Sequence, residues 1–262
     1  MEVLVLPTAE DVAARAADAV AAQVSRRPHT VLGVATGSSP LGTYRELARR
    51  RTEEALDLSQ LRCFALDEYV GLPGGHPAAY AEVLERELAG PFGLSASRVR
   101  VPDGSRPDLA QACQDYEDAI ARAGGIDLQL LGIGVNGHIG FNEPASSLAS
   151  RTRVKALSAR TRSDNARFFD DPGDVPTHCL TQGLGTILEA REVLLVAQGR
   201  HKAAAVAAAV EGPVSAMCPA SVLQLHRKAT VVVDEAAAGG LALTDYYRFV
   251  AEAGRRLPQG ET

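Results

Sequence analysis

The sequence predicts an α/β fold: an open, mostly parallel sheet with helices on both faces. Short apolar segments typical of buried strands alternate along the chain with longer segments of helical spacing. Strands separated by helices imply right-handed crossovers, which place helices on both faces of a parallel sheet. No linker rich in Pro, Gly and Ser and no internal repeat divides the 262 residues, so we expect a single domain over residues 1–262.

The predicted strands are short and apolar, and the predicted helices are longer and carry charges at helical spacing. The strands are residues 30–35, 61–66, 99–101, 128–133, 193–197 and 230–233. The helices are residues 9–23, 41–51, 78–88, 109–123 and 202–210. The first helix is alanine-rich, and Gly124-Gly125 ends the fourth. Arg49-Arg50-Arg51, beside Glu53 and Glu54, is interpreted as a solvated helix end.

Composition and charge exclude several classes of protein. The formal net charge is −5 and the pI is near 5.7, which argues against a nucleic-acid binder because such a protein needs a basic face. No signal peptide is evident, and no uncharged apolar run reaches transmembrane length. The four cysteines are far apart and form no Cys-x-x-Cys pair, as expected of reduced thiols. We therefore expect a cytoplasmic protein without nucleic-acid or membrane partners.

Unusual polar segments follow four of the predicted strands. These segments are residues 36–39, 67–69, 134–143 and 199–202. The carboxyl ends of parallel strands line one edge of an open sheet, where ligands bind. We therefore expect residues that are distant in sequence to meet in one cleft at this edge.

The first polar segment has features of an anion site. Thr36, Gly37, Ser38 and Ser39 offer backbone N–H groups and hydroxyls, and the following helix N-terminus adds positive potential. The segment is neither a Walker A sequence nor a G-x-G-x-x-G fingerprint, so nucleotide binding is not indicated. An ordinary strand-to-helix turn is the alternative.

Two cations, Arg167 and Lys202, are candidates to complete this anion site. Each is also typical of a solvated surface, so their role depends on whether the fold brings them to the loop around Gly37.

Two further segments carry acid–base candidates. Asp67 directly follows an apolar strand, where burial raises a carboxyl pKa and favours a base; a turn cap is the alternative. His138 lies among four glycines, in irregular backbone, and titrates near neutral pH. Glu143 is close enough in sequence to orient it, and Asn136 supplies neutral hydrogen bonds. There is no H-E-x-x-H pattern for a metal and no G-x-S-x-G elbow for a serine hydrolase. The residues alone therefore predict a site that carries out proton transfers on a phosphorylated metabolite.

In these segments the chain resembles the glucosamine-6-phosphate deaminase (glucosamine-6-phosphate isomerase) family. The matching pieces include VATGSSPLGTY, FALDEYVGL, LGIGVNGHIGFNEPASSLASRTRVKAL, TRSDNARFF, LTQGLGTIL and GRHKAAAVAAAVEG, in order over residues 31–226. The resemblance implies a Rossmann-like sheet of the group that includes ribose-5-phosphate isomerases and CoA-transferases. It also implies a hydrolase of amino-sugar (N-acetylglucosamine) catabolism that converts D-glucosamine 6-phosphate and water to D-fructose 6-phosphate and ammonia.

The resemblance also implies a role for each candidate residue. His138 and Glu143 would open the pyranose ring, and Asp67 would move the proton from carbon 2 to carbon 1 before ammonia is lost. Some family members carry Asp at the position of Asn136, which is therefore expected only to support His138. The substrate phosphate would be held by a loop and two cations, comprising Thr36, Gly37, Ser38, Ser39, Arg167 and Lys202. Neither a metal nor another cofactor is expected.

Some family members are hexamers activated by N-acetylglucosamine 6-phosphate, so a homo-oligomer is one expectation. Four residues match positions of that effector site: Ser146, Arg153, Lys155 and Tyr247. Ala156 stands where the activated members carry a hydroxyl, which argues against activation here.

Three other functions compete with this prediction. A 6-phosphogluconolactonase would hydrolyse its substrate without releasing ammonia, and a galactosamine-6-phosphate deaminase would prefer the other amino sugar. A non-catalytic sugar-phosphate sensor would carry a helix-turn-helix, and we expect none before Val31 or after Leu243.

Overall fold

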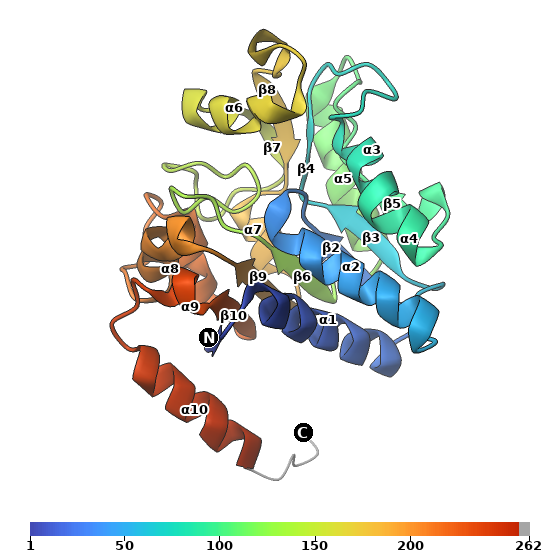
Figure 1. The fold of residues 1–262 in the computed structure, drawn as a ribbon. Helices are drawn as coiled ribbons and strands as arrows, with labels where there is room; N and C mark the ends of the chain where they lie inside the picture. The colour runs from blue at the N-terminus through green and yellow to red at the C-terminus, as the bar shows by residue number, and fades with distance from the viewer. Residues whose placement is uncertain (257–262) are drawn as a thin grey trace.

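The computed structural model describes residues 1–256 and contains a seven-stranded parallel sheet (Figure 1). The strand order is β1-β10-β9-β6-β2-β3-β5. The bounds are β1 (Glu2–Leu6), β2 (Val31–Val34), β3 (Arg62–Ala65), β5 (Val99–Arg100), β6 (Leu128–Leu131), β9 (Glu192–Ala197) and β10 (Ala229–Asp234). From β2 the chain proceeds through β3 to β5, and from β6 it proceeds the other way through β9 to β10. The order therefore reverses between β2 and β6, where an open α/β sheet forms its ligand crevice.

Helices cover both faces of this sheet, as predicted from the sequence. The α-helices are α1 (Ala9–Arg26), α2 (Ser38–Glu53), α3 (Tyr80–Leu84), α4 (Gly90–Phe92), α5 (Leu109–Arg122), α6 (Ala159–Asn165), α7 (Leu184–Leu188), α8 (Ala203–Val210), α9 (Glu235–Ala238) and α10 (Thr244–Arg256). A π-helical turn, residues 85–89, joins α3 to α4, so the predicted helix over 78–88 is divided. Short 3-10 turns include η3 (Ala166–Phe168) and η5 (Arg200–Lys202).

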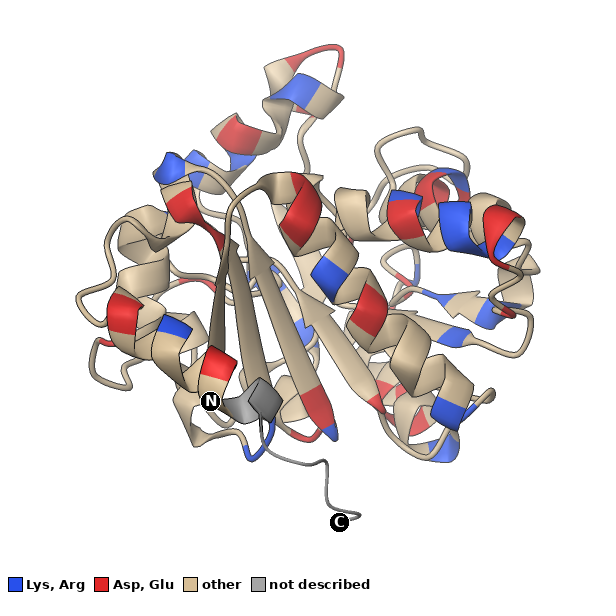
Figure 2. Cartoon of the chain, turned by 60° about the horizontal axis from the view of Figure 1, so that its bottom comes forward, with Lys and Arg blue, Asp and Glu red and all other residues tan. Residues whose placement is uncertain are grey.

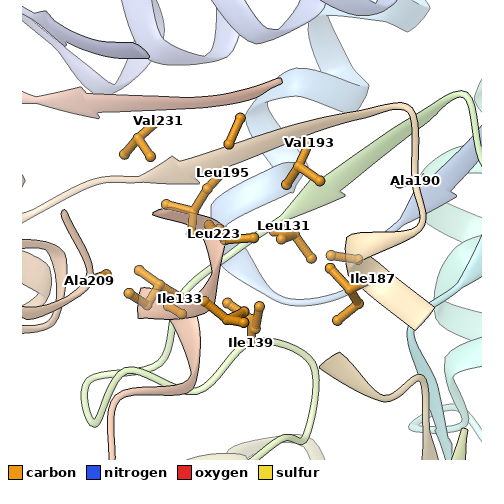
Figure 3. Packing of buried hydrophobic residues seen from close by; sticks show 14 of the residues in the cluster. Leu131, Ile133, Ile139, Ile187, Ala190, Val193, Leu195, Ala209, Leu223 and Val231 are labelled. Atoms are coloured by element: carbon orange, nitrogen blue, oxygen red, sulfur yellow. The ribbon is translucent and has the colours of Figure 1, made fainter. Parts of the chain in front are cut away.

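Two hydrophobic cores lie on opposite faces because successive side chains of each strand point to opposite sides. In β9, Leu194 and Val196 pack with α1 and α2, whereas Val193 and Leu195 pack with α5, α7 and α8. Figure 3 shows the second core, in which Leu195 lies near Leu223. Ile139 is fully buried in this core, so it anchors the loop that follows β6.

A second sheet, not predicted from the sequence, has three antiparallel strands. It consists of β4 (Asp67–Tyr69), β8 (His178–Thr181) and β7 (Arg153–Ala156), in the order β4-β8-β7. Asp67 is opposite Thr181, and the backbone N–H of Gln182 donates to Leu66 O at 2.7 Å. The polar segment after β3 is thus itself a strand, which leaves the main sheet directly after Leu66.

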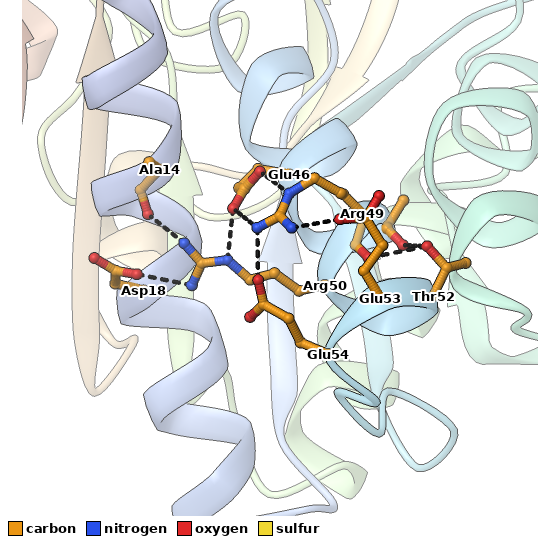
Figure 4. Close-up of polar contacts among 9 residues, drawn as sticks. Ala14, Asp18, Glu46, Arg49, Arg50, Thr52, Glu53 and Glu54 are labelled. Carbon is orange, nitrogen blue, oxygen red and sulfur yellow. Dashed lines mark hydrogen bonds and ion pairs between the residues drawn. The ribbon is translucent and has the colours of Figure 1, made fainter.

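Charges of both signs are mixed along the surface helices, whereas the strands are mostly uncharged (Figure 2). The arginine run on α2 is a network of ion pairs at the helix end: Arg49 bonds to Glu46, Glu53 and Glu54, and Arg50 reaches Asp18 on α1 (Figure 4). Arg50 therefore joins α1 to α2. None of the described helices is long and apolar enough to cross a membrane.

Asp127 is a buried polar node at the start of β6. Its side chain is 1 % exposed and accepts hydrogen bonds from Arg27 at 2.7 Å, Arg191 at 3.0 Å and the Val31 backbone N–H at 2.8 Å. It thereby ties the first residue of β2 to β6 and to the turn before β9. Removing the carboxylate leaves a buried N–H group unpaired, which is costly.

We predict that Asp127→Ala lowers the free energy of unfolding by about 2 kcal/mol, because it leaves the buried Val31 N–H unpaired and removes ion pairs to two half-exposed arginines. Urea unfolding followed by circular dichroism measures this loss. Arg26→Ala is the matched control, because its 3.7 Å contact with Glu192 is exposed and its removal costs less than about 1 kcal/mol. Equal losses in the two variants would contradict the role of Asp127.

Candidate active site

The loop after β2 closes into a tight turn that presents the start of α2. The buried Tyr44 hydroxyl donates to Ala35 O at 2.7 Å and accepts the Ala35 N–H at 3.1 Å. Gly37 precedes the first residue of α2 with φ of +91°, a conformation that a residue with a side chain rarely adopts. No side chain caps this helix, so its first N–H groups are available to an anion.

The sheet brings the ends of β6 and β9 to this loop. A Cβ at Gly132 would lie 3.3 Å from Ser39 Cβ, so the loop after β6 contacts the start of α2. Gln198, after β9, donates to Ser39 O at 3.2 Å. Gly37 and Ser38 are exposed, whereas Thr36 and Ser39 are half-buried. One side of the loop is therefore open to a ligand, and the other packs against the segments after β6 and β9.

The two predicted cations lie on different elements. Lys202, at the end of η5, donates to Ile133 O at 2.6 Å and is half-buried. Burial lowers the pKa of Lys202, and the nearby charge of Arg167 lowers it further. Arg167 is exposed on η3, with its guanidinium 4.7 Å from the Phe168 ring centre. The side chain of Lys202 thus reaches the loop after β6, which also contacts Ser39. The place of Arg167 at the anion site stays a prediction.

Asp67 is buried, with 6 % of its surface exposed. Within residues 1–256 no side chain or backbone group donates a hydrogen bond to its carboxylate. Burial, reinforced by the charge of Glu68, raises the pKa of Asp67 to about 8. Its Oδ2 is 3.5 Å from the position of a Cβ at Gly140, so it faces the loop that carries His138.

The capping role considered for Asp67 belongs instead to its neighbour. Glu68 accepts the backbone N–H groups of Tyr69 at 2.8 Å and of Tyr80 and Ala81 at 2.9 Å. It therefore caps the start of α3. Asp67 is left without a structural hydrogen bond, which is consistent with a chemical role.

The His138 loop is held by close backbone approach. The Gly134 N–H donates to His138 O at 2.9 Å, and the imidazole covers Gly134 so closely that a Cβ there would lie 2.2 Å from the ring. Burial lowers the pKa of His138, the charge of Lys202 lowers it further, and Glu143 acts in the opposite direction. The imidazole is therefore neutral near pH 7 and able to accept a proton.

Asn136 connects His138 to Glu143. Its Oδ1 accepts the His138 backbone N–H at 3.2 Å, and its Nδ2 donates to Glu143 Oε2 at 2.7 Å. The Glu143 Oε2 to His138 Nδ1 distance is 3.8 Å, too long for the direct hydrogen bond expected from the sequence. The Glu143 carboxylate therefore acts on the imidazole electrostatically, without a hydrogen bond. Asn136 is hydrogen-bonded to the backbone of His138 and not to its ring.

Sequence reasoning missed two hydroxyl groups at this site. Thr161 and Ser158, at the start of α6, both donate to Glu143 Oε1. Their signal in the sequence is the segment Ser-Ala-Arg-Thr, in which Ser158 caps α6 by accepting the Thr161 N–H at 3.1 Å. Nothing in that pattern alone points to Glu143. Among residues 1–256 no group of three or more His, Cys, Asp or Glu side chains is arranged to hold a metal ion.

The four residues matched to an effector site do not lie together. Arg153 and Lys155 share one side of β7, and Ser146 is buried in the loop after Glu143. Tyr247 lies on α10, across the molecule from β7, and donates to Glu211 at 3.1 Å (Figure 1). Within one chain Tyr247 is remote from β7, because α10 packs beside β1 at the opposite end of the fold. The effector site stays a prediction from the sequence.

Comparison with known proteins identifies relatives over almost the whole chain. The family model for glucosamine-6-phosphate isomerases/6-phosphogluconolactonase matches residues 7–232. The glucosamine-6-phosphate deaminase of Arthrobacter sp. (strain FB24) is 60 % identical over 248 residues, covering 95 % of each chain. That of Streptomyces coelicolor is 57 % identical over 249 residues, again 95 % of each.

Comparison with solved structures also finds a glucosamine-6-phosphate deaminase. A monomeric glucosamine-6-phosphate deaminase has a TM-score of 0.89 and 41 % identity, with 92 % of this chain and 100 % of that chain covered. The 6-phosphogluconolactonase of Trypanosoma brucei has a TM-score of 0.73 at 19 % identity, with 92 % and 98 % covered, which shows a shared fold. The resemblance predicted from the sequence is confirmed, and the chain belongs to the glucosamine-6-phosphate isomerase/6-phosphogluconolactonase family.

Proposed function

We propose that this protein converts D-glucosamine 6-phosphate and water to D-fructose 6-phosphate and ammonia, a step of amino-sugar catabolism. The relatives that are 55–60 % identical over nearly the whole chain are glucosamine-6-phosphate deaminases. The observation that carries the proposal is the buried carboxylate of Asp67 facing the His138 loop, since aldose–ketose isomerisation needs a base that works near neutral pH.

Phosphate binding at the start of α2 fixes the substrate in this proposal. The N–H groups and hydroxyls of residues 36–39 hold the anion, and the helix N-terminus stabilises its charge. Lys202 and Arg167 supply the neutralising cations. Anchoring the phosphate, which does not react, directs binding energy to the placement of carbons 1 and 2 beside Asp67.

Ring opening comes first and uses His138. The neutral imidazole takes the proton of the anomeric hydroxyl and returns it to the ring oxygen. Between these two transfers the imidazole is an imidazolium, and the Glu143 carboxylate, 3.8 Å from His138 Nδ1, stabilises its charge. Asn136 orients Glu143 through its 2.7 Å hydrogen bond.

Asp67 then carries out the isomerisation. It removes the proton from carbon 2 of the open-chain aldose while a proton of the substrate's ammonium group passes to oxygen 1, which gives an enolamine. Asp67 then delivers its proton to carbon 1. The resulting ketose imine adds water and loses ammonia. These steps are proton transfers and a hydrolysis, so they require neither a metal nor a redox cofactor. A cytoplasmic location and a homo-oligomeric assembly stay predictions from the sequence.

An ammonia-release assay tests the proposal against its rivals. Purified protein is supplied separately with glucosamine 6-phosphate, galactosamine 6-phosphate and 6-phosphogluconolactone. We expect ammonia and fructose 6-phosphate from the first substrate at the highest kcat/KM. Hydrolysis of the lactone alone would establish the lactonase, and absence of turnover on all three would favour the sensor.

We predict that Asp67→Asn lowers kcat at least about 100-fold and leaves KM within about 3-fold, because the amide keeps the shape of the side chain but cannot take a proton. Exchange of the carbon 2 proton in heavy water, followed by nuclear magnetic resonance, is the measurement. Undiminished exchange in this variant would refute the role of Asp67.

The raised pKa of Asp67 also predicts a pH-dependent stability. The unfolded carboxyl ionises near pH 4 and the folded one near pH 8, so the folded state holds an extra proton between these values. Wild-type stability therefore falls relative to Asp67→Asn as pH rises from about 4 to about 8, by several kcal/mol in total. Urea unfolding at intervals of pH measures the difference. Asp170→Asn, at an exposed position, is the control and should show no such trend.

A further inference from the structure

Glu143 is held from two sides by groups that leave its carboxylate little freedom. Only 8 % of the residue is exposed. Its Oε2 accepts the Asn136 amide at 2.7 Å, and its Oε1 accepts the hydroxyl of Thr161. The first donor belongs to the loop after β6 and the second to α6. The direction in which Oε2 faces His138 therefore depends on both elements.

Thr161 is the principal hydroxyl donor on the α6 side. The Ser158 hydroxyl lies 3.2 Å from Glu143 Oε1 and 3.0 Å from Thr161 Oγ1, and its single proton can serve only one of them. That hydroxyl also accepts the Thr161 backbone N–H as the cap of α6. Thr161 is buried, with 5 % of its surface exposed, so water does not replace its hydroxyl if the group is removed.

The segment that carries Thr161 also carries a predicted phosphate ligand. Helix α6 continues into η3, which holds Arg167. Asn165, at the end of α6, donates to the Tyr69 hydroxyl at 2.8 Å, and so fastens the segment to β4. Glu143, the cation and the strand of Asp67 are thus fixed relative to one another through this one segment.

We propose that Thr161 is a positioning residue for ring opening: its hydroxyl holds Glu143 Oε1 so that Oε2 faces His138. The inference rests on the proposed function. A hydrogen bond to a carboxylate is stronger than one between neutral groups, and groups that orient an active-site residue affect turnover without touching the substrate. Since Thr161 acts through Glu143, its effect on kcat must disappear in a variant whose residue 143 carries no charge.

The test compares variants that separate the hydroxyl from the shape of the side chain. Thr161→Val keeps the shape and removes the donor, and we expect kcat on glucosamine 6-phosphate to fall about 10- to 100-fold with KM within about 3-fold. Thr161→Ser restores most of kcat. Ser163→Ala is the control, because Ser163 is exposed on the same helix, and it should match the wild type.

A double-mutant cycle with Glu143→Gln distinguishes positioning from a general structural effect. In that background Thr161→Val should change kcat less than about 2-fold. An equal loss in both backgrounds, or a wild-type kcat in Thr161→Val, would overturn the inference. If Thr161→Val does not fold, the ratio of Thr161→Ser to Thr161→Ala measures the same hydroxyl. A wild-type protein that releases no ammonia would instead overturn the proposed function.

Discussion

The pairing of β2 with β6 is the constraint on which the site depends. Gly33 on β2 is paired with Gln129 on β6, and the Gln129 side chain lies where a Cβ of residue 33 would stand, 2.0 Å from that position. Gln129 is fully buried, so it has no space to move aside. Any larger residue at 33 would have to displace the buried Gln129 amide, which donates to Leu130 O. Because the loops for the anion and for His138 continue from these strands, the pairing of β2 with β6 holds the two halves of the site together.

Burial shifts the pKa values of three groups in the assembled site, and desolvation is the largest cause of each shift. It raises the pKa of Asp67 and lowers the pKa values of His138 and Lys202, so each shift favours the neutral form. The pKa of Asp67, about 8, therefore lies above the lowered pKa of His138, which is the reverse of their order in water. A carboxyl group whose pKa lies near neutral pH can both take a proton from the substrate and return it.

Much of this arrangement could be predicted from the sequence, because it follows from local patterns. The buried strands at 30–35 and 128–133 are short, mostly apolar segments, and the rule for parallel sheets places their following loops together. The second sheet could not be predicted in this way. β4 is only Asp67–Tyr69, with two acidic residues among three, and it is a strand because β8 pairs with it from more than 100 residues away. The hydrogen bond from Thr161 to Glu143 could not be predicted either, because it joins α6 to the loop after β6 through tertiary packing.

Asn136 shows how one substitution changes the balance of charges around His138. Its Nδ2 is 2.7 Å from Glu143 Oε2, so a carboxylate at position 136 would place two negative oxygens in contact. One of the two would then retain a proton, and the pair would titrate as a unit. The amide instead donates a hydrogen bond and leaves Glu143 as the anion with the larger effect on the imidazole, ahead of Asp164. With Oε1 bound by hydroxyls and Oε2 bound by an amide, that anion is fixed in place without a competing charge at position 136.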